Sequence, residues 1–136
     1  MSRFALVVDP DARRTRMLTG ALQLFQPGYQ VVNAPTLERA EVWIDARGVP
    51  DLLVVDLASS PEEAVQDWTR SHGVPADRVV AWPDPDAAPS ERFAVLPVDG
   101  SLSGVLAVIR GLDDRFRVDT GRSLGKTFRM NGTRGI

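Results

Sequence analysis

Three aspartates stand where short apolar segments end. Asp9 and Asp11 follow the run at residues 4–8 (FALVV), and Asp56 closes the segment at residues 51–56 (DLLVVD). In an open parallel sheet, ligands bind beyond the carboxyl ends of the strands, and carboxylate oxygens suit a hard cation such as Mg²⁺. The spacing therefore predicts a magnesium site, unless these aspartates only form turns and cap a helix.

The segments that would position these acids alternate between two periodicities. The run 4–8 has no polar residue, which is typical of a strand buried on both faces. Residues 18, 21, 22 and 25 are apolar at helical spacing. The pattern predicts strands at 4–8, 29–33, 51–56, 78–82 and 93–96, and helices at 11–25, 36–48, 61–72 and 101–112. This order predicts an α/β fold of three layers, a doubly wound parallel sheet with right-handed crossovers.

The connection between the fourth and fifth predicted strands does not have the sequence of a regular helix. Only the segment 83–92 separates the fourth and fifth predicted strands, and it contains Pro83, Pro85 and Pro89. Proline lacks the backbone N–H and clashes with the preceding helical turn. We therefore expect the helix that would connect the fourth and fifth strands (helix four of such a fold) to be shortened or missing.

Composition limits the class of protein. The 136 residues carry a net charge of −2 and no cysteine, which excludes disulfides and does not favour nucleic-acid binding. The apolar run near the start is too short for a membrane span, so we expect a cytoplasmic protein. We expect residues 1–112 to form one domain. Residues 113–136 predict a basic tail or linker: from Arg115 onward, five arginines and one lysine oppose one aspartate, a net charge of +5.

Four segments in this order resemble the receiver (CheY-like) domain of response regulators: FALVVDPDARR, PDLLVVDL, VVAW and FAVLP. The resemblance covers about residues 3–112. It implies a five-stranded sheet of order 2-1-3-4-5, Asp56 as the phosphoacceptor and Asp9 as a ligand of Mg²⁺, with Asp11 a poorer one. It also implies protein partners in a two-component signalling pathway, allows a homodimer, and gives no role for nucleic acid or a membrane.

Several positions depart from the receiver pattern. Pro10 follows Asp9 where the family has a second acid. Trp82 stands where the family has Ser or Thr, and Leu96 stands where it has Lys. Pro97 is retained, and Phe93 falls at the switch aromatic or is a simple core residue. The chain's single lysine, Lys126, lies far away in the tail.

These departures favour a degenerate pseudo-receiver, a non-enzymatic interaction module that needs no cofactor. Its candidate contact residues are Arg13, Arg14, Arg16 and Trp82, which we expect to be an exposed anchor. The arginines could instead pair with Asp9 and Asp56. The alternative is a working receiver that binds Mg²⁺ and is phosphorylated on Asp56. A third hypothesis follows from the Asp9-Pro10-Asp11 motif, which resembles the haloacid dehalogenase phosphatases and implies Asp9 as nucleophile.

Overall fold

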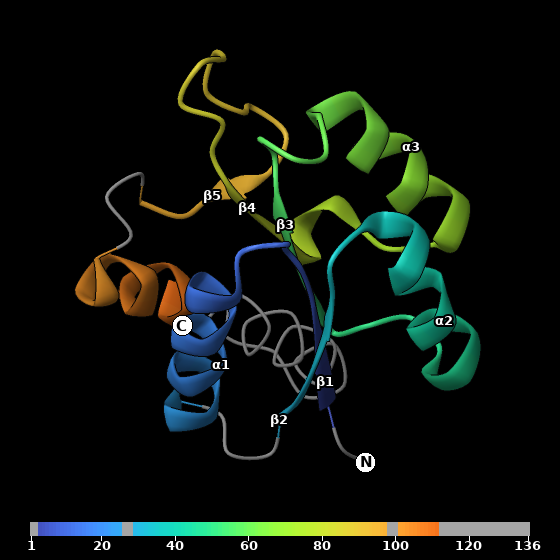
Figure 1. Cartoon of the computed structure of the whole chain (residues 1–136), viewed down its shortest axis with the longest axis horizontal. Helices are drawn as coiled ribbons and strands as arrows, with labels where there is room; N and C mark the ends of the chain where they lie inside the picture. Colours follow the sequence, from blue (N-terminus) through green and yellow to red (C-terminus); the bar gives the residue numbers. More distant parts are fainter. Residues whose placement is uncertain (1–2, 26–28, 98–100, 112–136) are drawn as a thin grey trace, which may run out of the picture.

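The computed structural model describes residues 3–25, 29–97 and 101–111, in which strands and helices alternate (Figure 1). Every predicted strand and helix is present there, within one residue of its predicted bounds. The elements are β1 (Arg3–Val8), α1 (Ala12–Phe25), β2 (Tyr29–Ala34), α2 (Leu37–Arg47), β3 (Leu52–Asp56), α3 (Glu62–His72), the short 3-10 helix η1 (Ala76–Arg78), β4 (Val79–Trp82), β5 (Ala94–Val95) and a last helix at residues 102–111.

The sheet has five parallel strands in the order β2-β1-β3-β4-β5. This confirms the predicted order 2-1-3-4-5. β1 and β3 lie side by side, and Val8 is in register with Val55. Because the strands are parallel, all their carboxyl ends meet at one edge of the sheet, where Asp9 and Asp56 are found.

Helices cover both faces of the sheet, which confirms the three-layer architecture. α1 and the last helix lie on one side, and α2 and α3 lie on the other (Figure 1). Alternate residues of each strand point to opposite faces, and two buried clusters result. The cluster under α1 and the last helix includes Val7, Leu18, Val54, Val80 and Val105. The cluster under α2 and α3 includes Leu6, Ala40, Val55, Val65 and Phe93.

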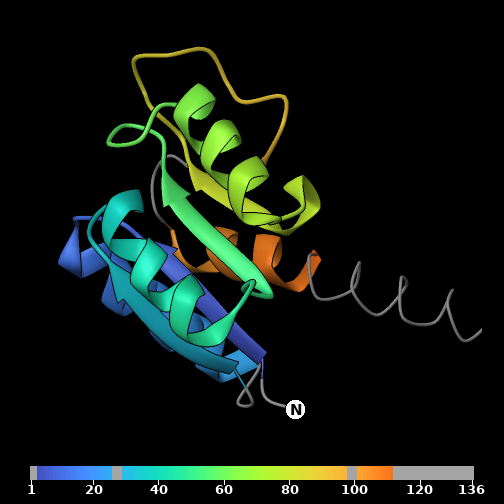
Figure 2. The ribbon, with the colours of Figure 1, turned by 90° about the vertical axis from the view of Figure 1, so that its right-hand side faces the viewer.

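Residues 83–93 contain no helix, as the prolines predict. The segment forms an irregular arch beside α3 (Figure 2). A turn at Asp84 organises it: the Ala87 N–H donates to the Asp84 carbonyl at 3.1 Å, and the Asp86 N–H donates to Asp84 Oδ1 at 3.0 Å. On this side of the sheet, an acidic, proline-rich loop thus takes the place of a fourth helix.

Within the ranges given above, no helix is long and apolar enough to cross a membrane. The predicted basic tail at 113–136, including Lys126, lies outside the described residues. Its role as a tail or linker, and the homodimer allowed by the resemblance, stay predictions.

Candidate functional site

The two carboxylates at the centre of the sheet lie on the same face. Asp9 follows β1 and Asp56 ends β3, and both continue the alternation of Val7 and Val54 towards α1. Trp82 ends β4 opposite Asp56 in the register, on that same face. The pleat therefore places two acids and an indole together under the first turns of α1.

Asp11 acts as the cap of α1. Its Oδ1 accepts hydrogen bonds from the N–H groups of Arg13 at 2.9 Å and Arg14 at 3.2 Å. These bonds, that of Arg14 above all, lower the pKa of Asp11 below its ordinary value of 3.8. The Asp11 N–H in turn donates to Asp9 Oδ1 at 2.9 Å. The capping interpretation fits this side chain, whose other oxygen, Oδ2, lies 3.7 Å from Arg14 Nε.

Arg14 joins the two buried acids. Its Nε lies 3.0 Å from Asp9 Oδ2, and its Nη2 lies 2.9 Å from Asp9 Oδ1 and 3.0 Å from Asp56 Oδ2. The exposed fractions of the side chains are 29% for Arg14, 0% for Asp9 and 5% for Asp56. Partial burial lowers the pKa of Arg14, but the hydrogen bonds and charges of the two acids outweigh burial and raise it. The guanidinium is therefore a permanent cation at this site.

The remaining contacts of Asp56 come from the loop that follows β3. Ser59 Oγ donates to Asp56 Oδ2 at 2.8 Å, and the Ala58 N–H donates to Oδ1 at 3.3 Å. Both oxygens of Asp56 are thus engaged. Sequence reasoning missed Ser59; a serine three residues after an aspartate in a turn is the signal that could have found it.

The three predicted contact arginines differ. Arg14 stands four residues before Leu18, on the apolar face of α1, and reaches the acids, whereas Arg13 and Arg16 are exposed. The hypothesis that an arginine pairs with Asp9 and Asp56 is therefore correct for Arg14.

The prediction that Trp82 is an exposed anchor is wrong. Its exposed fraction is 2%, because the strand alternation that places Val80 in the core places Trp82 there as well. The ring lies under Arg14, whose Cζ is 5.1 Å from the ring centroid, a cation–π distance. Nε1 of Trp82 is buried and has no hydrogen-bond partner in the described part of the chain.

The positions that flank β5 are also packed against the rest of the fold. Leu96 is buried, and its N–H donates to the Ala81 carbonyl at 2.8 Å. Phe93 is buried in the cluster under α2 and α3, as the simple core interpretation expects. Pro97 packs against the last helix: a Cβ added at Gly104 would lie 2.8 Å from Pro97 Cγ. The retained proline thus positions a helix.

The residues at this edge do not fit a divalent cation. In the described ranges no group of three or more acids, histidines or cysteines is arranged to hold a metal. Arg14 binds both central carboxylates, and Asp11 caps a helix. The predicted set Asp9, Asp56 and Asp11 therefore surrounds the Arg14 guanidinium: Asp9 and Asp56 lie 2.9–3.0 Å from it and Asp11 Oδ2 lies 3.7 Å from it.

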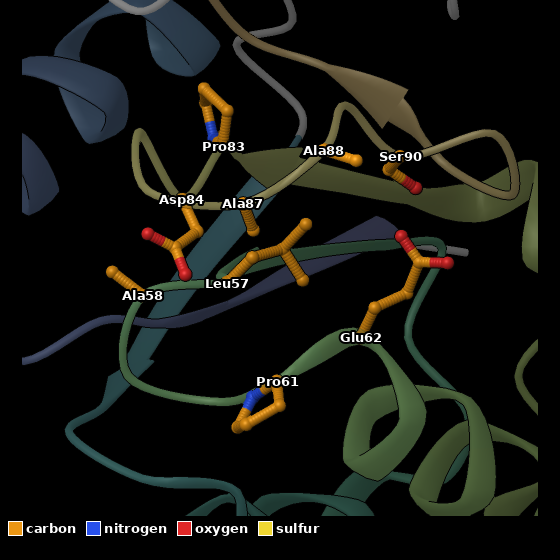
Figure 3. Close-up of a pocket in the computed structure, with 9 residues that line it drawn as sticks. All are labelled: Leu57, Ala58, Pro61, Glu62, Pro83, Asp84, Ala87, Ala88 and Ser90. Carbon is orange, nitrogen blue, oxygen red and sulfur yellow. The ribbon is translucent and has the colours of Figure 1, made fainter.

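A groove lies next to Asp56, between the β3–α3 loop and the segment 83–90. Its volume is about 160 Å³. Figure 3 shows Leu57 and Ala87 in its middle, with the carboxylates of Asp84 and Glu62 towards opposite ends. Arg92 Nη1 lies 3.4 Å from Glu62 Oε2. The full lining is Leu57, Ala58, Pro61, Glu62, Pro83, Asp84, Ala87, Ala88 and Ser90.

The sheet order, the helices on both faces and the acids at the carboxyl edge define the fold of a response-regulator receiver. No family model and no curated protein matches the chain significantly. Solved structures do. A response regulator from Thermotoga maritima has 18% identity and a TM-score of 0.58, covering 82% of this chain and 98% of its own.

Two further structures agree. The chemotaxis protein CheY4 of Vibrio cholerae has 15% identity and a TM-score of 0.63, covering 82% of this chain and 99% of its own. A two-component transcriptional regulator AraC from Clostridium phytofermentans has 13% identity and a TM-score of 0.68, covering 89% and 99%. At these identities the likeness shows the fold, and the chain has the CheY-like receiver fold.

Proposed function

We propose that this chain is a pseudo-receiver: a cytoplasmic module of two-component signalling that binds protein partners and is not controlled by phosphorylation of Asp56. One observation carries the proposal. Trp82 ends β4 opposite Asp56, and Leu96 follows β5 at the same edge of the sheet; both are buried in the core. A transferred phosphoryl group needs donors or cations aimed at its oxygens. An indole ring and an isobutyl group supply no hydroxyl and no ammonium there. The cation and the hydroxyl that do reach Asp56, those of Arg14 and Ser59, bind the carboxylate that would have to attack the phosphoryl group.

The second candidate is a working receiver. Asp56 at the carboxyl end of the central strand, next to Asp9, favours it. The third hypothesis, a phosphatase with Asp9 as nucleophile, has less support, because the Asp9 side chain has no exposed area and both its oxygens bind Arg14. Neither alternative explains why Asp9 and Asp56 are both bound to Arg14.

Incubation with acetyl phosphate and Mg²⁺, followed by intact mass measurement, separates these functions. We expect no phosphoryl adduct on the wild-type chain. An adduct that Asp56→Asn abolishes would overturn the proposal in favour of the working receiver. Steady release of phosphate that depends on Asp9 would favour the phosphatase. A receiver of known activity serves as the positive control for the reagent.

The contact surface of the module is the groove beside Asp56. Its floor is apolar, and Glu62 and Asp84 lie at its rim with Asp86 nearby. Carboxylates around an apolar floor favour a partner segment that presents arginine or lysine beside apolar side chains. A fourth helix would give this face a different shape, so we expect partners other than those of a phosphorylated receiver.

The surface is tested by comparing captured proteins between matched baits. Asp84→Asn keeps the oxygen that organises the turn at Asp84 and removes the charge. Asp77→Asn removes a charge at the far end of β4 and serves as the control. The test bait combines Asp84→Asn with Glu62→Gln. We expect a protein that binds both the wild type and Asp77→Asn but does not bind this double variant. Equal capture by all the baits would exclude the groove.

A further inference from the structure

We infer that Arg14 is the resident cation of this site, a guanidinium held where the acid pair would otherwise bind a divalent metal ion. The pair Asp9 and Asp56 is then closed to metal as long as Arg14 is present. This inference rests on the proposed function, because it explains how a receiver fold keeps two adjacent acids without metal-dependent chemistry.

The acids require a positive partner. Asp9 and Asp56 are almost fully buried side by side at the edge of the sheet. Buried carboxylates persist when a cation or a metal compensates their charge. Ser59 and the backbone N–H of Ala58 supply hydrogen bonds to Asp56, but they supply no charge. Arg14 supplies both.

The geometry puts the guanidinium between the acids. A single nitrogen, Nη2, lies 2.9 Å from Asp9 Oδ1 and 3.0 Å from Asp56 Oδ2. Mg²⁺ binds oxygen at about 2.0–2.1 Å and keeps several waters around it. A metal ion on these same two oxygens would meet Nη2, so the metal and the guanidinium exclude each other by space and by charge.

The guanidinium is also held in place from behind. Nε and Nη2 form a fork on Asp9, a bidentate arrangement that fixes the plane of the group. The Trp82 ring lies beneath Cζ. Asp11 caps the turn of α1 from which Arg14 extends. Because these contacts pre-organise a cation that belongs to the chain, a metal ion from solution has to displace it.

The test removes the charge and keeps an unbranched side chain. Arg14→Met retains an unbranched stem over Trp82. We expect it to bind Mn²⁺ at least tenfold more tightly than the wild type, measured from the spin-resonance signal of free Mn²⁺. Adding Asp9→Asn to this variant should abolish the gain. Arg16→Met, an exposed arginine of the same helix, should behave like the wild type. Arg14→Lys, which keeps a cation, should also bind no more than the wild type.

Each outcome decides. Wild-type binding as tight as that of Arg14→Met overturns the inference, and so does a folded Arg14→Met that gains nothing. If Arg14→Met is unfolded without metal, refolding by Mn²⁺ supports the inference, and failure to refold while Arg14→Lys folds overturns it. The assay contains no phosphodonor, so its failure is distinct from the phosphoryl adduct that would refute the proposed function.

Discussion

Loss of the Arg14 charge should destabilise the fold far more than loss of an ordinary surface arginine. Arg14 makes three charge-assisted contacts of 2.9–3.0 Å with two buried carboxylates. Removing one partner of a buried ion pair costs about 3–5 kcal/mol, whereas exposed pairs contribute about 0.2–1 kcal/mol. Because 29% of the Arg14 side chain is exposed, we expect Arg14→Met to lower the free energy of unfolding by about 2–4 kcal/mol.

The assay is a double-mutant cycle with Asp9→Asn, followed by urea unfolding with tryptophan fluorescence and circular dichroism. The coupling energy between Arg14 and Asp9 should be about 1.5–3 kcal/mol, within the range for groups in direct contact. Arg16→Met should stay within about 0.5 kcal/mol of the wild type. A cost for Arg14→Met below about 0.5 kcal/mol, or strictly additive single changes, would refute the description of Arg14 as a buried bridge.

Four further substitutions test other parts of the structure. The lowered pKa of Asp11 means that its charged form stabilises the fold above its ordinary value of 3.8, and this contribution fades as the pH falls below that value. Asp11→Asn, which can still cap but carries no charge, should therefore lower the denaturation midpoint at neutral pH and weaken the loss of stability in acid. Gly104→Ala should destabilise the fold by about 1–3 kcal/mol, because the new methyl group meets Pro97. Gly20→Ala has open space around its Cβ and should stabilise α1 by about 0.5–1 kcal/mol; the opposite order in thermal melts would contradict the packing of Pro97. Trp82→Ala should lower the free energy of unfolding by about 3–5 kcal/mol, and a urea midpoint equal to that of the wild type would contradict the burial of Trp82.

The fold was accessible from the sequence because local and tertiary preferences agree. Strands buried on both faces have no polar positions, as in residues 4–8, and the helix at 11–25 has a single apolar stripe. Three prolines within 83–89 exclude a regular helix, and none forms there. Since parallel strands require crossovers, the order of the elements left few topologies.

The candidate site was accessible only in part. The carboxyl ends of β1 and β3 had to bring Asp9 and Asp56 together, but the sequence offered three arginines as possible partners. Helical phase relative to Leu18 selects Arg14, and this becomes decisive only once the sheet lies beneath that face. Trp82 was misplaced because a neighbouring proline loop suggested exposure. Its alternation with Val80, two residues earlier, sends the ring into the core.

If Arg14 fills the site, the acid pair is closed to both a metal ion and a phosphoryl group. Diffraction from crystals soaked in Mn²⁺ and beryllofluoride tests it most directly, since manganese scatters anomalously and beryllofluoride mimics a phosphoryl group on aspartate. We expect no anomalous peak near Asp9 and no added density on Asp56, with the Arg14 guanidinium between them. A manganese ion bound to both acids, with Arg14 displaced into solvent, would contradict it.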